Sequence, residues 1–311
     1  KKGNVSYGTL TTISESIFDF NTIVTGSDDG VVSLTRDSGV TWTEISASLP
    51  RNFWVSRVLT SNHEAGRIFV TLNGYRWDDF TPYVYVTEDF GQTWTSISSN
   101  LPLGAVNVIS EDPSHSDLLY LGTDDGIYVS FDMGNHWDIF NAGLPPVACH
   151  DLVIQSEAQE LVAGTHGRSV FIADISALQA FVAEGAKGLF VATPNPVKFS
   201  KMWGRAYSKW SEPYMPNFSL EFFSPEKGQA SLKLMGSGKK AIWKKTLTLD
   251  QGYNVWNYDL TLTEDEFKSL KKANLKGLSP GEQGLIFLPK GTYKLQLSFR
   301  GLVVESNLII N

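Results

Sequence analysis

The chain has 311 residues, a hydrophobic content of 42% and a formal net charge of −7 at pH 7. The length fits two domains or one large domain, and the apolar content is enough for packed cores. The acidic balance argues against a nucleic-acid partner, which calls for a basic patch.

The sequence holds a single cysteine, Cys149, so no intrachain disulfide can form. This usage fits either a reducing cytoplasm or an exported bacterial protein that avoids cysteine. The sequence contains no run of about 18 apolar residues, so we expect no membrane-spanning helix. It begins Lys-Lys-Gly, without a methionine or a signal peptide, which we interpret as a processed or cleaved start.

A short pattern, Ser/Thr-x-Asp-x-Gly-x-Thr/His-Trp, occurs three times in the first half, each time followed by a Leu-Pro at the same distance. The Asp, Gly and Trp of the three copies are Asp37, Gly39 and Trp42; Asp89, Gly91 and Trp94; and Asp132, Gly134 and Trp137. A pattern that recurs with a period of roughly 40–50 residues predicts the blades of a propeller or another repeat array.

The pattern has the chemistry of a β-hairpin turn. The Asp carboxylate can accept hydrogen bonds from nearby backbone N–H groups, and the Gly permits a backbone conformation that a Cβ penalises. The Trp is expected to open the next strand and to pack its large apolar face between blades. We interpret the pattern as structural, because it contains no nucleophile and no obvious ligand set.

Each copy lies in a unit of four short antiparallel strands, marked by alternation and by turn residues. We expect strands at 8–13, 22–26, 31–35 and 42–46 in the first unit, at 54–60, 68–72, 83–87 and 94–98 in the second, and at 105–110, 118–122, 126–130 and 137–140 in the third. A fourth unit shows strands at 149–154, 161–164 and 170–173, and no further copy of the pattern follows.

These units predict an all-β fold class in which residues 1–176 form part of a β-propeller with about four blades, the last one incomplete. Four blades without a sealing strand would leave exposed sheet edges. We therefore expect the ring to be completed by an upstream propeller half or by a partner chain.

The turn between the second and third strands carries the candidate site residues. It reads Gly-Ser-Asp-Asp-Gly in the first unit and Gly-Thr-Asp-Asp-Gly in the third, and Asp-Gly favours a tight hairpin. The second unit has a longer loop at 73–82 instead, and a loop that departs from its own repeat often carries function. An ordered, packed insertion is the ordinary alternative.

Aromatic faces beside charges suit a sugar or a peptide ligand. The ligand-binding candidates are Tyr75, Arg76, Trp77, His166 and Arg168. The catalytic candidates are the carboxylates Asp78, Asp79, Asp124 and Asp125, which are otherwise simple turn residues. We find no phosphate-binding loop, nucleophile elbow or zinc signature, and predict no cofactor and no metal.

The three copies resemble the Asp-box, or bacterial neuraminidase, repeat. The stretches 122–130 and 164–172 resemble bacterial sortilin-like propeller proteins, which are often labelled glycosyl hydrolases. The resemblance covers about residues 7–178. Sortilins bind peptides and proteins, whereas other Asp-box propellers are glycosidases, so the shared fold alone does not decide the function.

Three functions follow as expectations from this resemblance. The first is an exported protein- or glycan-binding or scaffold module, with an extracytoplasmic location. The second is a glycoside hydrolase that uses two propeller carboxylates. The third is an assembly subunit of a larger envelope complex.

The repeat stops near residue 176, and a connector is expected at 177–195. Residues 196–311 are expected to form a β-sandwich of immunoglobulin type, with strands at 217–224, 230–235, 242–249, 252–259, 291–299 and 302–310. A capping box that begins at Thr263 predicts a helix to about residue 273.

The stretches 249–260 and 288–293 resemble the immunoglobulin-like module of flagellar hook-capping proteins. That resemblance implies packing, anchoring or partner contact. The aromatic and basic segment 202–210 is expected either to be buried against the propeller or to form a ligand platform.

Overall fold

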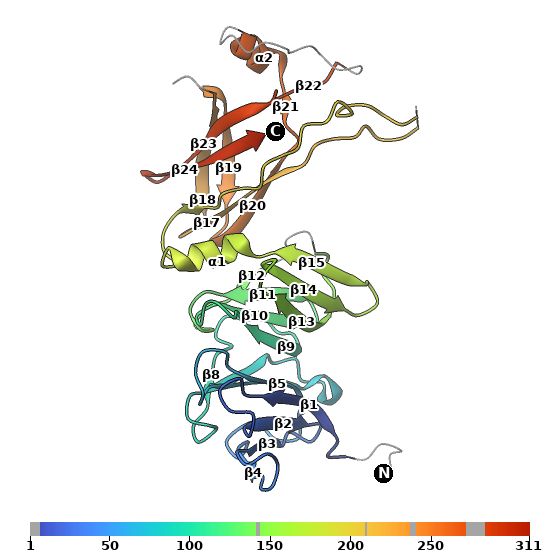
Figure 1. Cartoon of the computed structure of the whole chain (residues 1–311), viewed down its shortest axis with the longest axis vertical. Helices are drawn as coiled ribbons and strands as arrows, with labels where there is room; N and C mark the ends of the chain where they lie inside the picture. Colours follow the sequence, from blue (N-terminus) through green and yellow to red (C-terminus); the bar gives the residue numbers. More distant parts are fainter. Residues whose placement is uncertain (1–6, 141–143, 209, 237–240, 272–283) are drawn as a thin grey trace. The chain divides into compact units, whose positions relative to one another are not determined.

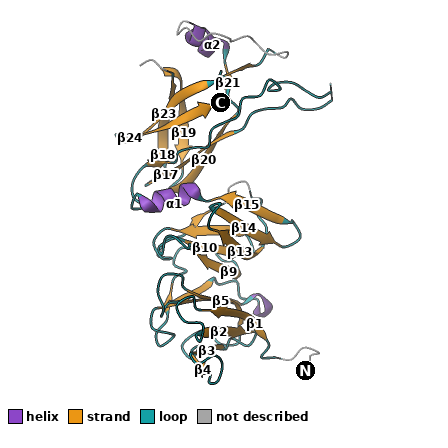
Figure 2. Cartoon of the chain, in the orientation of Figure 1, coloured by secondary structure: helices purple, strands orange, loops and turns teal. Residues whose placement is uncertain are grey.

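The computed structural model describes residues 7–140, 144–208, 210–236, 241–271 and 284–311. The chain divides into two compact units, Lys1–Ala183 and Glu184–Asn311. The division falls inside the connector expected at 177–195. Figures 1 and 2 show units built mainly of strands, with the short helices α1 (Ser176–Ala183) and α2 (Glu264–Lys271). The all-β prediction is confirmed.

The described part of the first unit contains four antiparallel sheets, each made of strands that are consecutive in the chain. We call these sheets blades 1 to 4. Blade 1 is β1 (Leu10–Glu15), β2 (Ile23–Ser27), β3 (Val32–Thr35) and β4 (Thr43–Glu44). Blade 2 is β5 (Trp54–Thr60), β6 (Ile68–Asn73), β7 (Tyr83–Thr87) and β8 (Thr95–Ser96). Blade 3 is β9 (Val106–Glu111), β10 (Leu119–Thr123), β11 (Gly126–Ser130) and β12 (Asp138–Ile139).

Blade 4 consists of β13 (Cys149–Gln155), β14 (Glu160–Thr165) and β15 (Val170–Asp174). No fourth strand pairs with β15 among the described residues. This arrangement confirms the prediction of a partial propeller whose last blade is incomplete.

The outer strands are shorter than expected, with two residues each in β4, β8 and β12. The expected strands at 42–46, 94–98 and 137–140 are therefore too long. The chain leaves the ladder early because it turns again at once: Leu49 N–H donates to the Ser46 carbonyl at 3.0 Å, and Leu101 N–H donates to that of Ser98 at 3.2 Å.

Apolar side chains gather between neighbouring blades. One buried cluster joins blade 1 to blade 2 and includes Val24, Ile45 and Val58. A second cluster joins blade 2 to blade 3 and includes Ile97 and Trp137. Each blade therefore buries its apolar surface against its neighbours, as expected of a repeat that cannot form a core alone.

The three copies of the Ser/Thr-x-Asp-x-Gly-x-Thr/His-Trp pattern, which we call boxes, form the turns that lead from the third strand of a blade to the outer strand. In the second box, Asp89 Oδ1 accepts hydrogen bonds from the Thr87 hydroxyl at 2.7 Å and from Thr93 N–H at 2.9 Å, and Oδ2 accepts one from the Thr93 hydroxyl at 2.7 Å. Gly91 has a φ of 85°, where a glycine is favoured. The predicted turn chemistry is confirmed.

These hydrogen bonds predict a loss of stability in acid. Hydrogen bonding, above all from Thr93 N–H, lowers the pKa of Asp89 to about 2, and hydrogen bonding led by the Thr41 hydroxyl lowers that of Asp37. A carboxyl with a lowered folded pKa stabilises the fold above its unfolded pKa of about 3.9 and loses this effect as the pH falls toward 2.

We therefore expect the free energy of unfolding, measured in urea, to fall between pH 4 and pH 2. The Asp89→Asn variant should show a shallower fall over the same range. An identical pH dependence in both proteins would contradict the prediction.

The described part of the second unit contains two larger antiparallel sheets that face each other across one core. The three-stranded sheet has the order β16 (Phe190–Val191), β17 (Phe218–Ser224), β20 (Gly252–Tyr258). The four-stranded sheet has the order β19 (Ala241–Leu249), β18 (Gly228–Met235), β23 (Gly291–Phe299), β24 (Leu302–Ile310). A small ladder pairs β21 (Thr261–Leu262) with β22 (Ile286–Phe287). The six expected strands are confirmed, while the immunoglobulin-like assignment stays a prediction.

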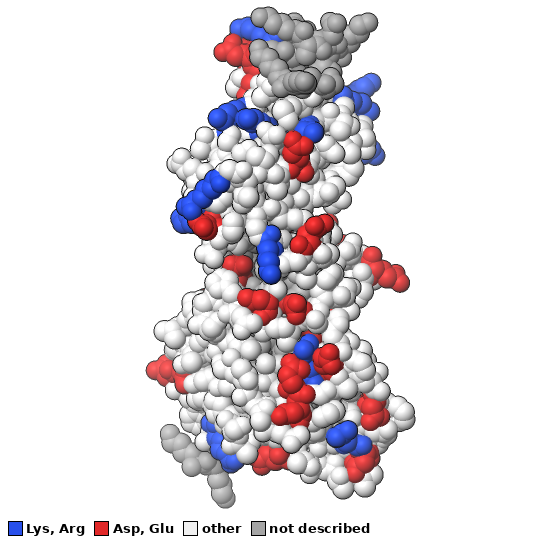
Figure 3. Space-filling model, turned by 90° about the vertical axis from the view of Figure 1, so that its left-hand side faces the viewer, with Lys and Arg blue, Asp and Glu red and all other residues white. Residues whose placement is uncertain are grey.

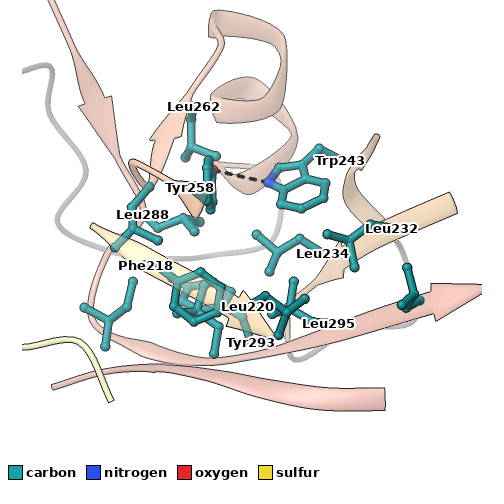
Figure 4. Close-up of a cluster of buried hydrophobic side chains, with 14 of the residues drawn as sticks. Phe218, Leu220, Leu232, Leu234, Trp243, Tyr258, Leu262, Leu288, Tyr293 and Leu295 are labelled. Atoms are coloured by element: carbon teal, nitrogen blue, oxygen red, sulfur yellow. Dashed lines mark hydrogen bonds between the residues drawn. The ribbon is translucent and has the colours of Figure 1, made fainter. Parts of the chain in front are cut away.

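Figure 4 shows the core of this unit, with Leu220 from β17, Leu234 from β18 and Leu295 from β23 directed toward one another. The indole N–H of Trp243 donates to the Tyr258 hydroxyl at 3.2 Å across the edge of the two sheets. Alternate residues along β18 and β23 are buried, as period-2 patterning requires.

The capping box of helix α2 is confirmed. Thr263 N–H donates to Glu266 Oε2 at 2.7 Å, and Glu266 N–H donates to the Thr263 hydroxyl at 3.3 Å. The expected end of this helix, at residues 272 and 273, lies outside the described residues.

Within segment 202–210, Trp203 is buried in the core of the second unit, whereas Tyr207 and Trp210 are exposed. Within the described ranges, no helix is both long and apolar enough to cross a membrane.

Candidate functional site at the bulge end of the propeller unit

The four inner strands share a β-bulge close to their first residue. The register shifts between Leu10 and Thr12, between Val55 and Arg57, between Val106 and Val108, and between Cys149 and Asp151. The extra residues are Thr11, Ser56, Asn107 and His150. Because the start of each inner strand pairs with the end of the second strand, the turns between the second and third strands lie at this same end. We call it the bulge end.

The long loop of blade 2 is an ordered turn at the bulge end. It contains one 3-10 turn, Tyr75–Trp77, closed by a hydrogen bond from Trp77 N–H to the Gly74 carbonyl at 2.8 Å. Asn73 Oδ1 accepts from Tyr75 N–H at 2.9 Å. A Cβ on Gly74 would lie 2.7 Å from the Asp79 carbonyl oxygen, so only glycine allows this closure.

The loop presents two aromatic side chains to solvent. Tyr75 is 61% exposed and Trp77 is 58% exposed. Arg76 is also exposed, and its guanidinium lies 5.1 Å from the centre of the Trp54 ring. Tyr75 contacts the edge of Phe80, with ring centres 5.9 Å apart. The backbone hydrogen bonds fix the loop, and the Phe80 contact holds the Tyr75 ring, before any ligand arrives.

A chain of buried polar side chains links this loop to blade 3. Asn73 Nδ2 donates to Asn107 Oδ1 at 2.9 Å, and Asn107 Nδ2 donates to Asp124 Oδ1 at 2.9 Å. Both asparagines are buried. The structure therefore brings the loop of blade 2 and the candidate carboxylate Asp124 into one hydrogen-bonded system.

The other candidate carboxylates have distinct surroundings. Hydrogen bonding from Thr81, chiefly from its backbone N–H, lowers the pKa of Asp79, whose Oδ2 also accepts from the Tyr83 hydroxyl at 2.9 Å. Asp79 is therefore ionised at neutral pH and does not suit the role of a proton donor. Asp78 ends the 3-10 turn in the left-handed region with a φ of 61°.

Asp125 is exposed and lies beside the far end of the same loop. A Cβ on Gly104 would lie 3.3 Å from Asp125 Oδ2, and Gly104 N–H donates to the Phe80 carbonyl at 2.7 Å. Asp124 and Asp125 therefore both flank the loop of blade 2.

The turn of blade 4 carries His166 and Arg168, which are exposed. His166 lies against His150, the extra residue of the bulge, with ring centres 5.5 Å apart. Between blades 2 and 4, Arg57 donates to Asp151 Oδ1 at 2.5 Å. Within the described part of the chain, His166 and Arg168 make no hydrogen bond, ion pair or ring contact with Tyr75 or Trp77. The ligand-binding candidates therefore form two groups: the aromatic loop and the turn of blade 4.

The residues that link the blades were not expected from the sequence. Asn73, Asn107, Arg57, Asp151 and His150 form the polar contacts of the bulge end, yet they occupy no recognisable motif. Asn107 and His150 are the extra residues of their bulges, and Arg57 and Asp151 directly follow one, whereas Asn73 ends β6. A sequence shows such a residue only when the strand register is known.

The chemistry of this end suits the binding of a polar ligand with an apolar face. Among the described residues, no group of three or more His, Cys, Asp and Glu side chains could hold a metal ion. Acidic and basic side chains are interspersed on the face drawn in Figure 3, and the described basic residues on that face form no continuous stripe.

No family model matches the chain, and no curated protein sequence matches it. Many solved structures resemble it, including the following three. A GH74 enzyme from Niastella koreensis is 14% identical with a TM-score of 0.43, over 68% of this chain and 33% of that one. The GH74 xyloglucanase from Xanthomonas campestris is 9% identical with a TM-score of 0.44, over 96% and 47%.

The third similar structure is YCF48 from Cyanidioschyzon merolae, which is 17% identical with a TM-score of 0.36, over 71% of this chain and 68% of that one. This chain thus matches half or less of the length of the two GH74 proteins. The strand order and register given above define its fold independently of these similarities.

Proposed function

We propose that this chain is an exported, sortilin-like Asp-box propeller module that binds a protein or a glycan at its bulge end. In this proposal the ring is completed by an upstream segment or by another chain, and the module works outside the cytoplasm. The observation that carries the binding role is the loop of blade 2, which departs from the repeat and holds Tyr75 and Trp77 exposed.

Three features support this assignment. The loop is ordered by its own backbone hydrogen bonds, so little conformational entropy is lost when a ligand binds. Its aromatic faces can stack on a sugar ring or on an apolar peptide side chain. The neighbouring Asp124 and Asp125 add hydrogen-bond acceptors for hydroxyl or amide groups.

Replacing both Tyr75 and Trp77 by alanine is the direct test. The protein is first screened against a glycan array and a peptide library, and the best ligand is then titrated by calorimetry. We expect the double variant to bind this ligand ~10-fold more weakly or worse, since each aromatic contact contributes about 0.5–1.5 kcal/mol.

The matched control is Tyr207→Ala, which removes an exposed aromatic side chain from the second unit. Equal weakening in the control and in the double variant would contradict the assignment. Hydrolysis of an array glycan that Asp124→Asn abolishes would replace binding by glycosidase activity.

A further inference from the structure

The first blade exposes apolar residues on one face. The equivalent residues of blade 2 are buried. By strand register, Leu10 and Ile13 of β1 occupy the positions of Val55 and Val58 of β5. Val55 and Val58 are 0% and 1% exposed, whereas Leu10 and Ile13 are 65% and 69% exposed. We call the surface formed by Leu10, Ile13 and Trp42 the entry face. The residues of the entry face are as apolar as those of a blade interface, but they are exposed to solvent.

The box tryptophans show what covers this surface in the other blades. The indole N–H of Trp94 donates to the Ile45 carbonyl of blade 1 at 2.8 Å, and that of Trp137 donates to the Ile97 carbonyl of blade 2 at 2.6 Å. Trp42 instead donates to Gly39 of its own turn at 3.1 Å. The tryptophans of the second and third boxes thus bond to the preceding blade, whereas the tryptophan of the first box bonds within its own turn.

The box glycines show the same difference. A Cβ on Gly91 would lie 2.6 Å from Ile45, and one on Gly134 would lie 2.8 Å from Ile97. A Cβ on Gly39 would meet only Trp42 of its own box, at 3.7 Å. In blades 2 and 3 an aliphatic side chain of the preceding outer strand therefore packs directly on the box glycine.

We propose that a further four-stranded blade of the same repeat, joined in the same polypeptide to the segment that leads into β1, covers the entry face. Its outer strand places an aliphatic residue over Gly39, and the carbonyl of that residue accepts the indole N–H of Trp42. This inference deepens the proposed function and rests on it, because it specifies the blade by which the ring continues.

Covalent continuity favours a blade of the same polypeptide. In the pairs from blade 1 to blade 3, the outer strand leads through a Leu-Pro segment directly into the inner strand that packs on the same blade. A blade connected in this way meets the entry face without the entropy cost of association.

A second copy of the described blades does not fit. By register, Phe171 and Ile172 of β15 match Tyr128 and Val129 of β11, which pair with outer strand β12. Apart from β14, no described strand pairs with β15. Blade 4 of a second copy therefore has no described outer strand on which a residue of the Ile45 type could lie over Gly39.

The centre of the face further specifies the covering blade. Thr25 and Ser33 of blade 1 occupy the positions of Val70 and Tyr85 of blade 2. These side chains are smaller, so the covering blade needs bulkier residues opposite them to reach the packing density of the other interfaces.

Site-specific photo-crosslinking in the full-length protein tests this proposal. A photoreactive phenylalanine analogue replaces Ile13, and a control protein carries the same analogue in place of the exposed Leu103. We expect the crosslink from position 13 to reach a peptide that lies before Lys1 in the same polypeptide. A crosslink to a separate protein or to a second copy, or a yield no higher than at position 103, would overturn the proposal.

A surrogate blade gives an independent readout. A second copy of residues 47–105 is joined directly to Leu10, which matches Val106 in register. We expect hydrogen exchange of the Trp42 indole N–H to slow by roughly 100-fold in this protein. Ile97→Lys in the added copy should abolish this protection, and unchanged exchange in the unsubstituted fusion would contradict the inference.

The two proposals can fail separately. The crosslink and the exchange rate report on the entry face, whereas ligand binding by Tyr75 and Trp77 reports on the bulge end. A negative result for the entry face would not affect the ligand-binding test, and a negative ligand-binding result would not affect the entry face.

Discussion

Replacing Trp137 by alanine is expected to lower the free energy of unfolding of the propeller unit by about 3–5 kcal/mol, the usual cost of removing a large buried aromatic side chain. Trp137 is 3% exposed and lies in the cluster between blades 2 and 3. Its indole N–H also donates to the Ile97 carbonyl at 2.6 Å, so the substitution leaves a cavity and an unpaired acceptor.

The matched control is Trp42→Ala, which changes the same position of the same repeat. In the 311-residue chain, which lacks the covering blade proposed above, Trp42 is 46% exposed and its described hydrogen bond stays within its own turn, so we expect a change within about 0.5 kcal/mol. Urea unfolding followed by hydrogen-exchange mass spectrometry on peptides of β9 to β11 separates the propeller unit from the second unit. Equal effects of the two substitutions would show that the box tryptophan stabilises its own turn and not the blade interface.

The contrast between Trp42 and Trp137 also marks how far the sequence could predict the fold. The box turns were predictable because their chemistry is local: the Asp, its hydroxyl donors and the positive-φ Gly lie within a few residues. The same pattern predicted that Trp42 packs between blades, but Trp42 is exposed in the structure. Its exposure depends on a neighbouring blade, and no residue within the box records whether that blade is present.

The bulges likewise limited how much of the candidate site could be predicted from the sequence. The departure of 73–82 from the repeat was enough to select Tyr75, Arg76 and Trp77, since a comparison of repeats needs no register. The polar chain through Asn73, Asn107 and Asp124 was not predictable, because Asn107 reaches both partners only after one extra residue shifts the inner strand.

The second large effect is expected at Glu111, a carboxylate at the end of β9. Its side chain is fully buried and accepts hydrogen bonds from the Ser61 hydroxyl at 2.9 Å and from Asn62 N–H at 2.6 Å. Arg67 Nη1 lies 3.4 Å from Glu111 Oε1. These partners belong to the turn after β5, so Glu111 connects blade 3 to blade 2.

We expect Glu111→Ala to lower the free energy of unfolding by about 3–5 kcal/mol, because it removes one partner of a buried, hydrogen-bonded charge pair. Glu88→Ala provides the control, since Glu88 bonds to the same arginine at 2.8 Å but is 55% exposed. The loss of an exposed ion pair costs about 0–1 kcal/mol.

Glu111→Gln separates the charge from the packing. The amide keeps the volume of the side chain and can still accept from Asn62 N–H, so a loss well below that of Glu111→Ala is expected if the hydrogen bonds dominate. Urea unfolding of the three variants at neutral pH measures their free energies of unfolding and ranks the three losses. A loss in Glu88→Ala as large as that in Glu111→Ala would mean that the exposed half of the Arg67 pair stabilises the blade contact as much as the buried half.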